Sequence, residues 1–259
     1  GERAERLGLL SPHVMTVAKA DAATRLLVLA ALTALEAPDV VDVCVGLPLH
    51  GYEEQGVVLQ SLLRGEHRVV AGGRERSLQL KGTVVPEGLG LWVRSLSRDG
   101  DAVDPSLVGV PTAVLDFGHR TIQMAVFTGL QMYARPYVSA HGVYELWEEA
   151  LIEQLEGPGQ TVFESPQRAV LMTRLLHDGV VSVRGKAVTL EMVRPRLKVA
   201  AGRLWTRIAE EVRRTLEQIP YERVVAGGGG VHLFIDQLTE MFGDSVVILR
   251  DRFAQAEGY

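Results

Sequence analysis

The sequence predicts an α/β fold built around a mixed β-sheet. Segments of helical period alternate with short apolar or β-branched runs that end at glycine or proline. Hairpin signals, in which glycine separates two such runs, interrupt this alternation. Because hairpins join antiparallel strands whereas helical crossovers join parallel ones, their combination favours a mixed sheet over a purely parallel one.

In the first part of the chain, three segments have helical character and four short runs have the composition of strands. The predicted helices are 22–35, 52–63 and 89–96. The predicted strands are 40–47, 68–71, 77–80 and 83–85, with a hairpin turn at Gly72-Gly73. The polar stretch 97–104 marks a boundary between two predicted domains, residues 1–108 and residues 109–259.

The second part of the chain continues the pattern of hairpins and helices. The predicted strands are 111–116, 121–127, 180–183, 187–190, 223–226 and 246–249. The predicted helices are 143–155, 167–176, 195–219 and 231–242. Ser165-Pro166 predicts one helix start, because serine caps a helix and proline is favoured at its first position. Pro195 predicts another start for the same reason.

The composition argues against several classes of protein. The net charge of −5, from 27 basic and 32 acidic residues, does not favour direct binding of nucleic acid by the whole surface. The single cysteine, Cys44, excludes a disulfide within the chain and predicts a reducing, cytoplasmic compartment. The longest apolar stretch, 26–35, is too short to cross a bilayer, so no membrane partner is expected. Because the chain opens at Gly1 rather than methionine, we expect a fragment of a longer reading frame.

The first candidate site is the segment Leu115–Thr121, which reads LDFGHRT between two apolar runs. A carboxylate at a strand end, Asp116, followed by Gly118 and Thr121, suits a hydrated Mg²⁺ with a phosphate against the turn amides. The alternative is a common Asp-x-Gly β-turn, in which the glycine supplies a positive φ. His119 is expected to face solvent or to donate to a phosphate, because no partner ligands stand at metal-site spacing.

The second candidate site is the run Gly227, Gly228, Gly229 and Gly230 between a predicted strand and a predicted helix. In this context glycines let a ligand approach the backbone near a helix N-terminus. A flexible surface loop is the alternative, but four glycines in sequence are costly to order, which favours close packing against something. The dinucleotide spacing G-x-G-x-x-G is absent, as are the Walker sequence and the G-x-S-x-G elbow.

The third candidate is Glu87, in Pro86-Glu87-Gly88 between a strand and a helix. Its carboxylate can orient or deprotonate a water. The alternative is a glutamate in the first turn that stabilises the helix dipole.

The order of these pieces resembles the actin-like ATPases of the ParM/StbA plasmid-segregation type, with their archaeal actin-like relatives. Six short segments carry the resemblance over nearly the whole chain. They are Gly1–Ala4 (GERA), Val43–Tyr52 (VCVGLPLHGY), Val85–Gly88 (VPEG), Leu115–Thr121 (LDFGHRT), Val224–Gly230 (VVAGGGG) and Phe253–Tyr259 (FAQAEGY).

The resemblance implies a ribonuclease H-like fold of two lobes that binds ATP or ADP with Mg²⁺. Glu87 would position the attacking water, and Asp116 would hold the Mg²⁺ shell. Gly118, His119, Arg120 and Thr121 would lie at the phosphates, and Gly227–Gly230 would lie against the adenosine. Residues 1–108 would be domain I, and residues 109–259 would be domain II. The family's N-terminal phosphate hairpin and its C-terminal helix would be missing from this fragment.

The resemblance also implies a function, for which three hypotheses remain open. The first is an ATPase that assembles into filaments and segregates or positions DNA or another cargo, with a DNA-bound adaptor as partner. The second is a small-molecule kinase or phosphatase of the same superfamily. The third is a nucleotide-binding scaffold without turnover, which is favoured by two departures from the family pattern, His119 and Gln123.

Overall fold

The computed structural model describes residues 21–71, 73–98, 102–156, 165–183, 185–251 and 254–257. The family-like stretch Gly1–Ala4 and part of Phe253–Tyr259 lie outside these residues. The chain forms two compact units, Gly1–Glu87 with Tyr259 and Gly88–Gly258, here called the first and second units. The predicted division into two domains after residue 108 stays a prediction.

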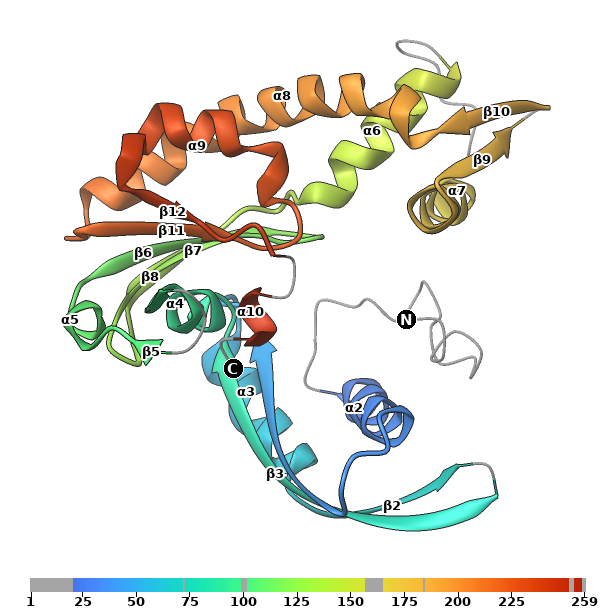
Figure 1. Cartoon of the computed structure of the whole chain (residues 1–259), viewed down its shortest axis with the longest axis vertical. Helices are drawn as coiled ribbons and strands as arrows, with labels where there is room; N and C mark the ends of the chain where they lie inside the picture. The colour runs from blue at the N-terminus through green and yellow to red at the C-terminus, as the bar shows by residue number, and fades with distance from the viewer. Residues whose placement is uncertain are drawn as a thin grey trace. The chain divides into compact units, whose positions relative to one another are not determined.

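The first unit contains a three-stranded sheet in the order β1-β3-β2 (Figure 1). β1 (Val40–Leu47) runs parallel to β3 (Arg74–Pro86), which pairs with the antiparallel β2 (Gly65–Ala71). Two helices accompany this sheet, α2 (Ala22–Ala34) and α3 (Tyr52–Leu63). The mixed sheet predicted from the sequence is therefore present in the first unit.

The two strands predicted at 77–80 and 83–85 are in fact one continuous strand, β3. Gly82 lies in its middle, between the two predicted runs. A Cβ at this position would come within 2.8 Å of Leu63 Cβ. Gly82 is thus required by the close approach of α3, whose Gln60 Nε2 also donates to Gly82 O at 3.2 Å. Glycine inside a strand often marks such an approach rather than an end.

The second unit contains a five-stranded sheet in the order β12-β11-β6-β7-β8. Its strands are β6 (Thr112–Phe117), β7 (Ile122–Thr128), β8 (Gln131–Val138), β11 (Arg223–Gly227) and β12 (Val246–Ile248). β11 is parallel to both β6 and β12, whereas β6, β7 and β8 form antiparallel hairpins. The sequence did not predict β8, which contains Pro136; proline is tolerated here because β8 is the last strand of the sheet.

Helices connect and cover these strands. The longer ones are α6 (Val143–Glu156), α7 (Ser165–Asp178), α8 (Leu190–Glu217) and α9 (Ile235–Phe242). The shorter ones are α4 (Leu89–Ser95), α5 (Pro105–Val108), η1 (Val231–Leu233), η2 (Gly243–Ser245) and α10 (Ala254–Glu257). Two small hairpins complete the unit, β4 (Ser97–Arg98) with β5 (Ala102–Val103), and β9 (Val180–Val183) with β10 (Lys186–Thr189).

Two helix predictions are corrected by the structure. Pro195 does not start α8 but lies inside it, because the helix begins at Leu190 directly after β10. Proline removes one backbone hydrogen bond there, and the buried Val193 and Leu197 on either side hold the helix against the core. The single helix predicted over 231–242 is divided into η1 and α9 at Phe234, whose buried ring packs into that core.

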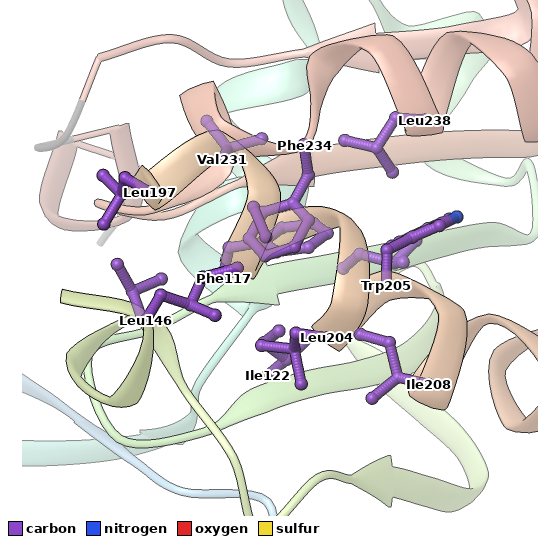
Figure 2. Packing of buried hydrophobic residues seen from close by; sticks show 14 of the residues in the cluster. Phe117, Ile122, Leu146, Leu197, Leu204, Trp205, Ile208, Val231, Phe234 and Leu238 are labelled. Atoms are coloured by element: carbon purple, nitrogen blue, oxygen red, sulfur yellow. The ribbon is translucent and has the colours of Figure 1, made fainter. Parts of the chain in front are cut away.

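The core of the second unit lies between the sheet and α6, α8 and α9 (Figures 1 and 2). Alternate residues of β6, ending in Phe117, point into it. The Phe117 ring stacks on Phe234 with centroids 4.7 Å apart, and Trp205 lies 6.5 Å from Phe117. Helix α4 packs against the opposite face of β6 and β11. β6 is therefore packed on both of its faces.

Candidate functional site

Two of the predicted site segments meet at the carboxyl ends of the parallel strands β6 and β11. Asp116 and Gly227 are direct neighbours across these strands. Gly230 N donates to Phe117 O at 3.0 Å, and a Cβ on Gly228 would strike Asp116 Oδ1. The structure thus brings the Asp116 turn and the glycine turn together within the second unit. Ligands of open α/β sheets bind outside the carboxyl ends of parallel strands.

The four glycines of this turn serve different contacts. A Cβ on Gly227 would come within 2.6 Å of the Leu91 side chain of α4. Gly228 has φ +92° and would press on the Phe117 backbone, with Phe117 N only 2.9 Å away. A Cβ on Gly230 would overlap the Val143 side chain at the start of α6. Gly229, in contrast, is exposed, and no atom lies within 4 Å of its added Cβ. Close packing explains three of the glycines, and Gly229 presents open backbone.

Internal hydrogen bonds fix the β6–β7 loop. Gly118 N donates to Thr121 O at 3.0 Å, so this amide is used within the loop. Gly118 does not have the positive φ that an Asp-x-Gly turn predicts; a Cβ there would instead come 2.8 Å from Thr121 O. The loop carbonyls accept from α6, since Val143 N bonds Gly118 O at 3.1 Å and Tyr144 N bonds His119 O at 2.8 Å. The loop and the first turn of α6 therefore form one rigid piece.

The exposed side chains of this loop pack on Tyr144. The His119 ring lies edge-on to the Tyr144 ring with centroids 5.2 Å apart. The Arg120 guanidinium carbon lies 4.5 Å from the centroid of the same ring. Desolvation of the imidazole and, second, the charge of Arg120 lower the pKa of His119. Both effects favour a neutral His119, which can donate one hydrogen bond and accept another.

Buried polar groups organise the base of the loop. Asp116 and Gln123 face each other across the β6–β7 pair, and both are buried. Gln123 Nε2 donates to Thr121 Oγ1 at 3.2 Å. Because the hydroxyl oxygen accepts this bond, its own proton is available to an acceptor outside the loop. Gln123 thus orients Thr121.

A cavity of about 580 Å³ is lined in part by the residues that directly follow the glycine turn in the sequence. Its size is in the range of small-molecule sites. It is lined by Trp147, Leu176, Leu190, Arg194, Leu197, Lys198, His232, Leu233, Ile235 and Asp236. Lys198 Nζ and Asp236 Oδ2 pair at 2.9 Å between α8 and α9. The cavity has mainly apolar walls with a few polar groups, as ligand pockets commonly do.

The sequence prediction missed every residue of this cavity. For His232–Asp236 a signal existed, because these residues directly follow the glycine turn. No comparable signal existed for the α6, α7 and α8 residues, which are distant in sequence. Helix α6 also connects the cavity to the β6–β7 loop, since Tyr144 contacts the loop and Trp147, one turn later, lines the cavity.

Glu87 is the last residue of the first unit. It is half-buried and lies in the chain connection from β3 to α4, the strand-to-helix connection that the sequence predicts. Its backbone N donates to Leu47 O at 2.7 Å, which extends the pairing of β1 with β3 by one residue. The water-positioning role of its carboxylate stays a prediction.

The donor set suits a weakly ligated hard cation. Within the ranges that the structure describes, no three His, Cys, Asp or Glu side chains gather as a metal cluster. Mg²⁺ commonly keeps several waters and binds one or two carboxylates together with substrate phosphates. The single buried carboxylate of Asp116 beside open backbone fits that pattern.

No helix among the described residues is both long and apolar enough to cross a membrane.

Comparisons with known proteins relate the chain to one group. Residues 1–90 match the family model for the N-terminal domain of actin-like proteins. The structure is similar to Ta0583, an archaeal actin homologue, with a TM-score of 0.68, 21% identity, and coverage of 94% of this chain and 76% of Ta0583. The complex of Ta0583 with ADP gives a TM-score of 0.67 at 21% identity, with coverage of 93% of this chain and 77% of Ta0583.

A filament protein gives a comparable match. The 15-stranded ParM filament from Clostridium botulinum gives a TM-score of 0.62 at 18% identity, with coverage of 93% of this chain and 73% of that one. No match was found among curated proteins. At these identities the structural likeness shows a shared fold.

Proposed function

We propose that this chain, an actin-like protein with the two-lobe fold expected from its sequence, binds a purine nucleoside triphosphate in the second unit. It hydrolyses the nucleotide with Mg²⁺. The nucleotide state controls its assembly into filaments that segregate or position a cargo. A DNA-bound adaptor protein is the proposed link to that cargo.

One observation carries the nucleotide proposal. The Asp116 loop and the glycine turn touch at the carboxyl ends of β6 and β11, and the cavity begins two residues after Gly230. Open backbone at Gly229 allows a ligand to pass between the loop and the cavity. We assign the phosphates to the loop and the base to the cavity. The complex of the similar archaeal protein with ADP supports nucleotide binding by a chain of this fold.

The loop chemistry agrees with phosphate binding. Thr121 has a hydroxyl proton to donate, Arg120 supplies a positive charge, and His119 keeps one ring N–H donor even in its neutral form. Asp116 would hold the hydration shell of Mg²⁺, which neutralises phosphate charge when it is bound. Glu87 would position the attacking water, as the family resemblance implies.

Filament formation is supported by the filament-forming proteins that share the fold, which include the ParM filament from Clostridium botulinum and the Alp12 filament. Nucleotide-dependent assembly is tested by centrifuging the protein with Mg-ATP, Mg-ADP or no nucleotide. Polymer that pellets only with Mg-ATP is the expected result. Equal pelleting in all three conditions would contradict nucleotide control.

Turnover is tested by phosphate release from Mg-ATP. Glu87→Ala should slow release by about 100-fold or more while nucleotide affinity is kept, because a positioned general base typically contributes that much. Glu217→Ala, an exposed glutamate at the end of α8, is the matched control and should hydrolyse ATP like the wild type. Unchanged turnover in Glu87→Ala would remove Glu87 from the mechanism.

A nucleotide-binding scaffold without turnover is the second candidate. The specific observation in its favour is that Gly118 N bonds Thr121 O, so the loop offers one amide fewer to a phosphate. Tight binding of ATP without phosphate release from the wild type would select this candidate. Phosphate transfer to a sugar or acyl acceptor would instead select the kinase hypothesis.

A further inference from the structure

We propose that Arg120 is an anion-binding side chain of the β6–β7 loop and that Tyr144 is the residue that positions it. This inference rests on the proposed function, because the anion that Arg120 addresses is the polyphosphate of the nucleotide. The family resemblance implies only that Arg120 lies at the phosphates, and the contact with Tyr144 adds the group that holds its side chain in place.

The geometry of Arg120 leaves its hydrogen-bond donors available. Its guanidinium carbon lies 4.5 Å from the centroid of the Tyr144 ring, and residue 120 is exposed. A guanidinium above an aromatic face is held by cation–π attraction. Its N–H groups lie around the edge of its plane, in a fork that matches the oxygens of a phosphate.

Arg120 is held without being neutralised. The carboxylate next to Tyr144 on α6 belongs to Glu145, and it pairs with His141 Nδ1 at 2.6 Å. Among the residues that the structure describes, no carboxylate forms an ion pair with Arg120. A guanidinium fixed by a ring, and not by a carboxylate, keeps its full charge for a ligand. The structural arginines of this unit differ, since Arg203 is clamped by both Glu149 and Glu153.

The backbone around Arg120 is fixed before any ligand binds. Tyr144 N donates to His119 O at 2.8 Å, so the ring and the arginine are carried by directly bonded segments. Gly142 lets the two segments approach, because a Cβ there would lie only 2.5 Å from Thr121 N. A group held in place in advance loses little conformational freedom on binding. Tyr144 therefore contributes by orienting Arg120 and not by touching the phosphate.

Calorimetric titration of the protein with Mg-ATP, Mg-ADP and adenosine tests this inference. Arg120→Ala should weaken Mg-ATP binding by about 10- to 100-fold, the range for a lost hydrogen bond to a charged group. Adenosine affinity should stay within about twofold, since adenosine has no phosphate. Tyr144→Leu should weaken Mg-ATP by about two- to fivefold, whereas Tyr144→Phe, which keeps the ring, should bind like the wild type.

Arg214→Ala is the matched control, because Arg214 is an exposed arginine of α8 beside Glu210 and outside the loop. It should bind all three ligands like the wild type. Unchanged Mg-ATP binding by Arg120→Ala would overturn the inference while leaving the proposed function intact. An equal loss of adenosine and Mg-ATP would also overturn it, by showing a structural effect. A wild-type protein that binds none of the ligands would overturn the proposed function, and this inference with it.

Discussion

The turns that follow β6 and β11 occupy the same edge of one sheet, yet they are built in opposite ways. The β6–β7 loop uses side chains: Asp116, His119, Arg120 and Thr121 each make or offer a polar contact. The β11–η1 turn has no side chains, and its glycines allow close approach of Leu91, Phe117 and Val143. One turn supplies chemistry, and the other supplies space for it.

This difference changes the meaning of the glycine run. From the sequence alone, four consecutive glycines favoured close packing against something, and their position between a strand and a helix favoured a ligand. In the structure, most of that packing is against the protein itself, and Gly229 alone of the four faces open space. The main role of the glycine run is therefore to let the Asp116 loop pack closely against the end of β11 and the start of α6. Any ligand benefits indirectly, because the loop it meets is rigid.

Of the substitutions that test this difference between the two turns, Gly228→Ala is expected to have the largest effect on stability. Gly228→Ala places a side chain at φ +92° and against Asp116 and the Phe117 backbone. We expect a loss of about 3 kcal/mol in the free energy of unfolding, from backbone strain and overpacking together. Urea unfolding of the second unit, followed by tryptophan fluorescence, measures it.

Gly229→Ala is the matched control for that measurement. Gly229 does not have a positive φ and has open space around its added Cβ, so the change should stay within about 0.5 kcal/mol. Equal effects at the two positions would contradict the division of roles within the turn.

A second prediction sharpens the role of the loop. Asp116→Asn keeps the shape of the buried side chain but removes its charge. If Asp116 holds the hydration shell of Mg²⁺, the gain in ATP affinity that Mg²⁺ provides should fall by about 10- to 100-fold. Losses of this size are typical for residues that hydrogen-bond to the ligands of a metal. Titration of ATP with and without Mg²⁺ measures this. Retention of the full Mg²⁺ effect in Asp116→Asn would remove Asp116 from the metal site.

Much of the fold could be predicted from local pattern. The strands that carry the two turns, β6 and β11, were predicted to within one residue at each end, because their apolar runs end in clear turn signals. The long helix α8 was recognised, but its start was misplaced at Pro195 because helix-start statistics were applied where core packing of Val193 and Leu197 decides. Strand β8 was missed because Pro136 hides its character.

The site was less accessible to sequence reasoning than the fold. Asp116 and the glycine turn were each visible as motifs, but their contact depends on the parallel pairing of strands more than a hundred residues apart. The cavity depends on residues from α6, α7, α8 and α9, none of which forms a motif. The stacking of Arg120 on Tyr144 depends likewise on how α6 meets the loop. Such features follow from packing, which local sequence patterns do not encode.

The smallest expected effect concerns the titration of His119. Desolvation and the charge of Arg120 lower the pKa of His119 in the folded chain, so the unfolded chain binds its proton more readily. Between the folded pKa and the ordinary value of about 6.5, unfolding therefore takes up a proton and stability rises with pH. The contribution of His119 is complete above the ordinary pKa and is lost as pH falls through this window. His119→Gln should flatten the stability profile there.

The two causes of the His119 shift can be separated by NMR titration of the imidazole. Arg120→Gln removes the nearby positive charge but leaves the ring against Tyr144, so the pKa of His119 should rise only part of the way to its ordinary value. Tyr144→Leu removes much of the desolvating contact and should raise the pKa further, because desolvation is the larger cause. The reverse order would mean that the Arg120 charge, and not the packing on α6, dominates the electrostatics of this loop.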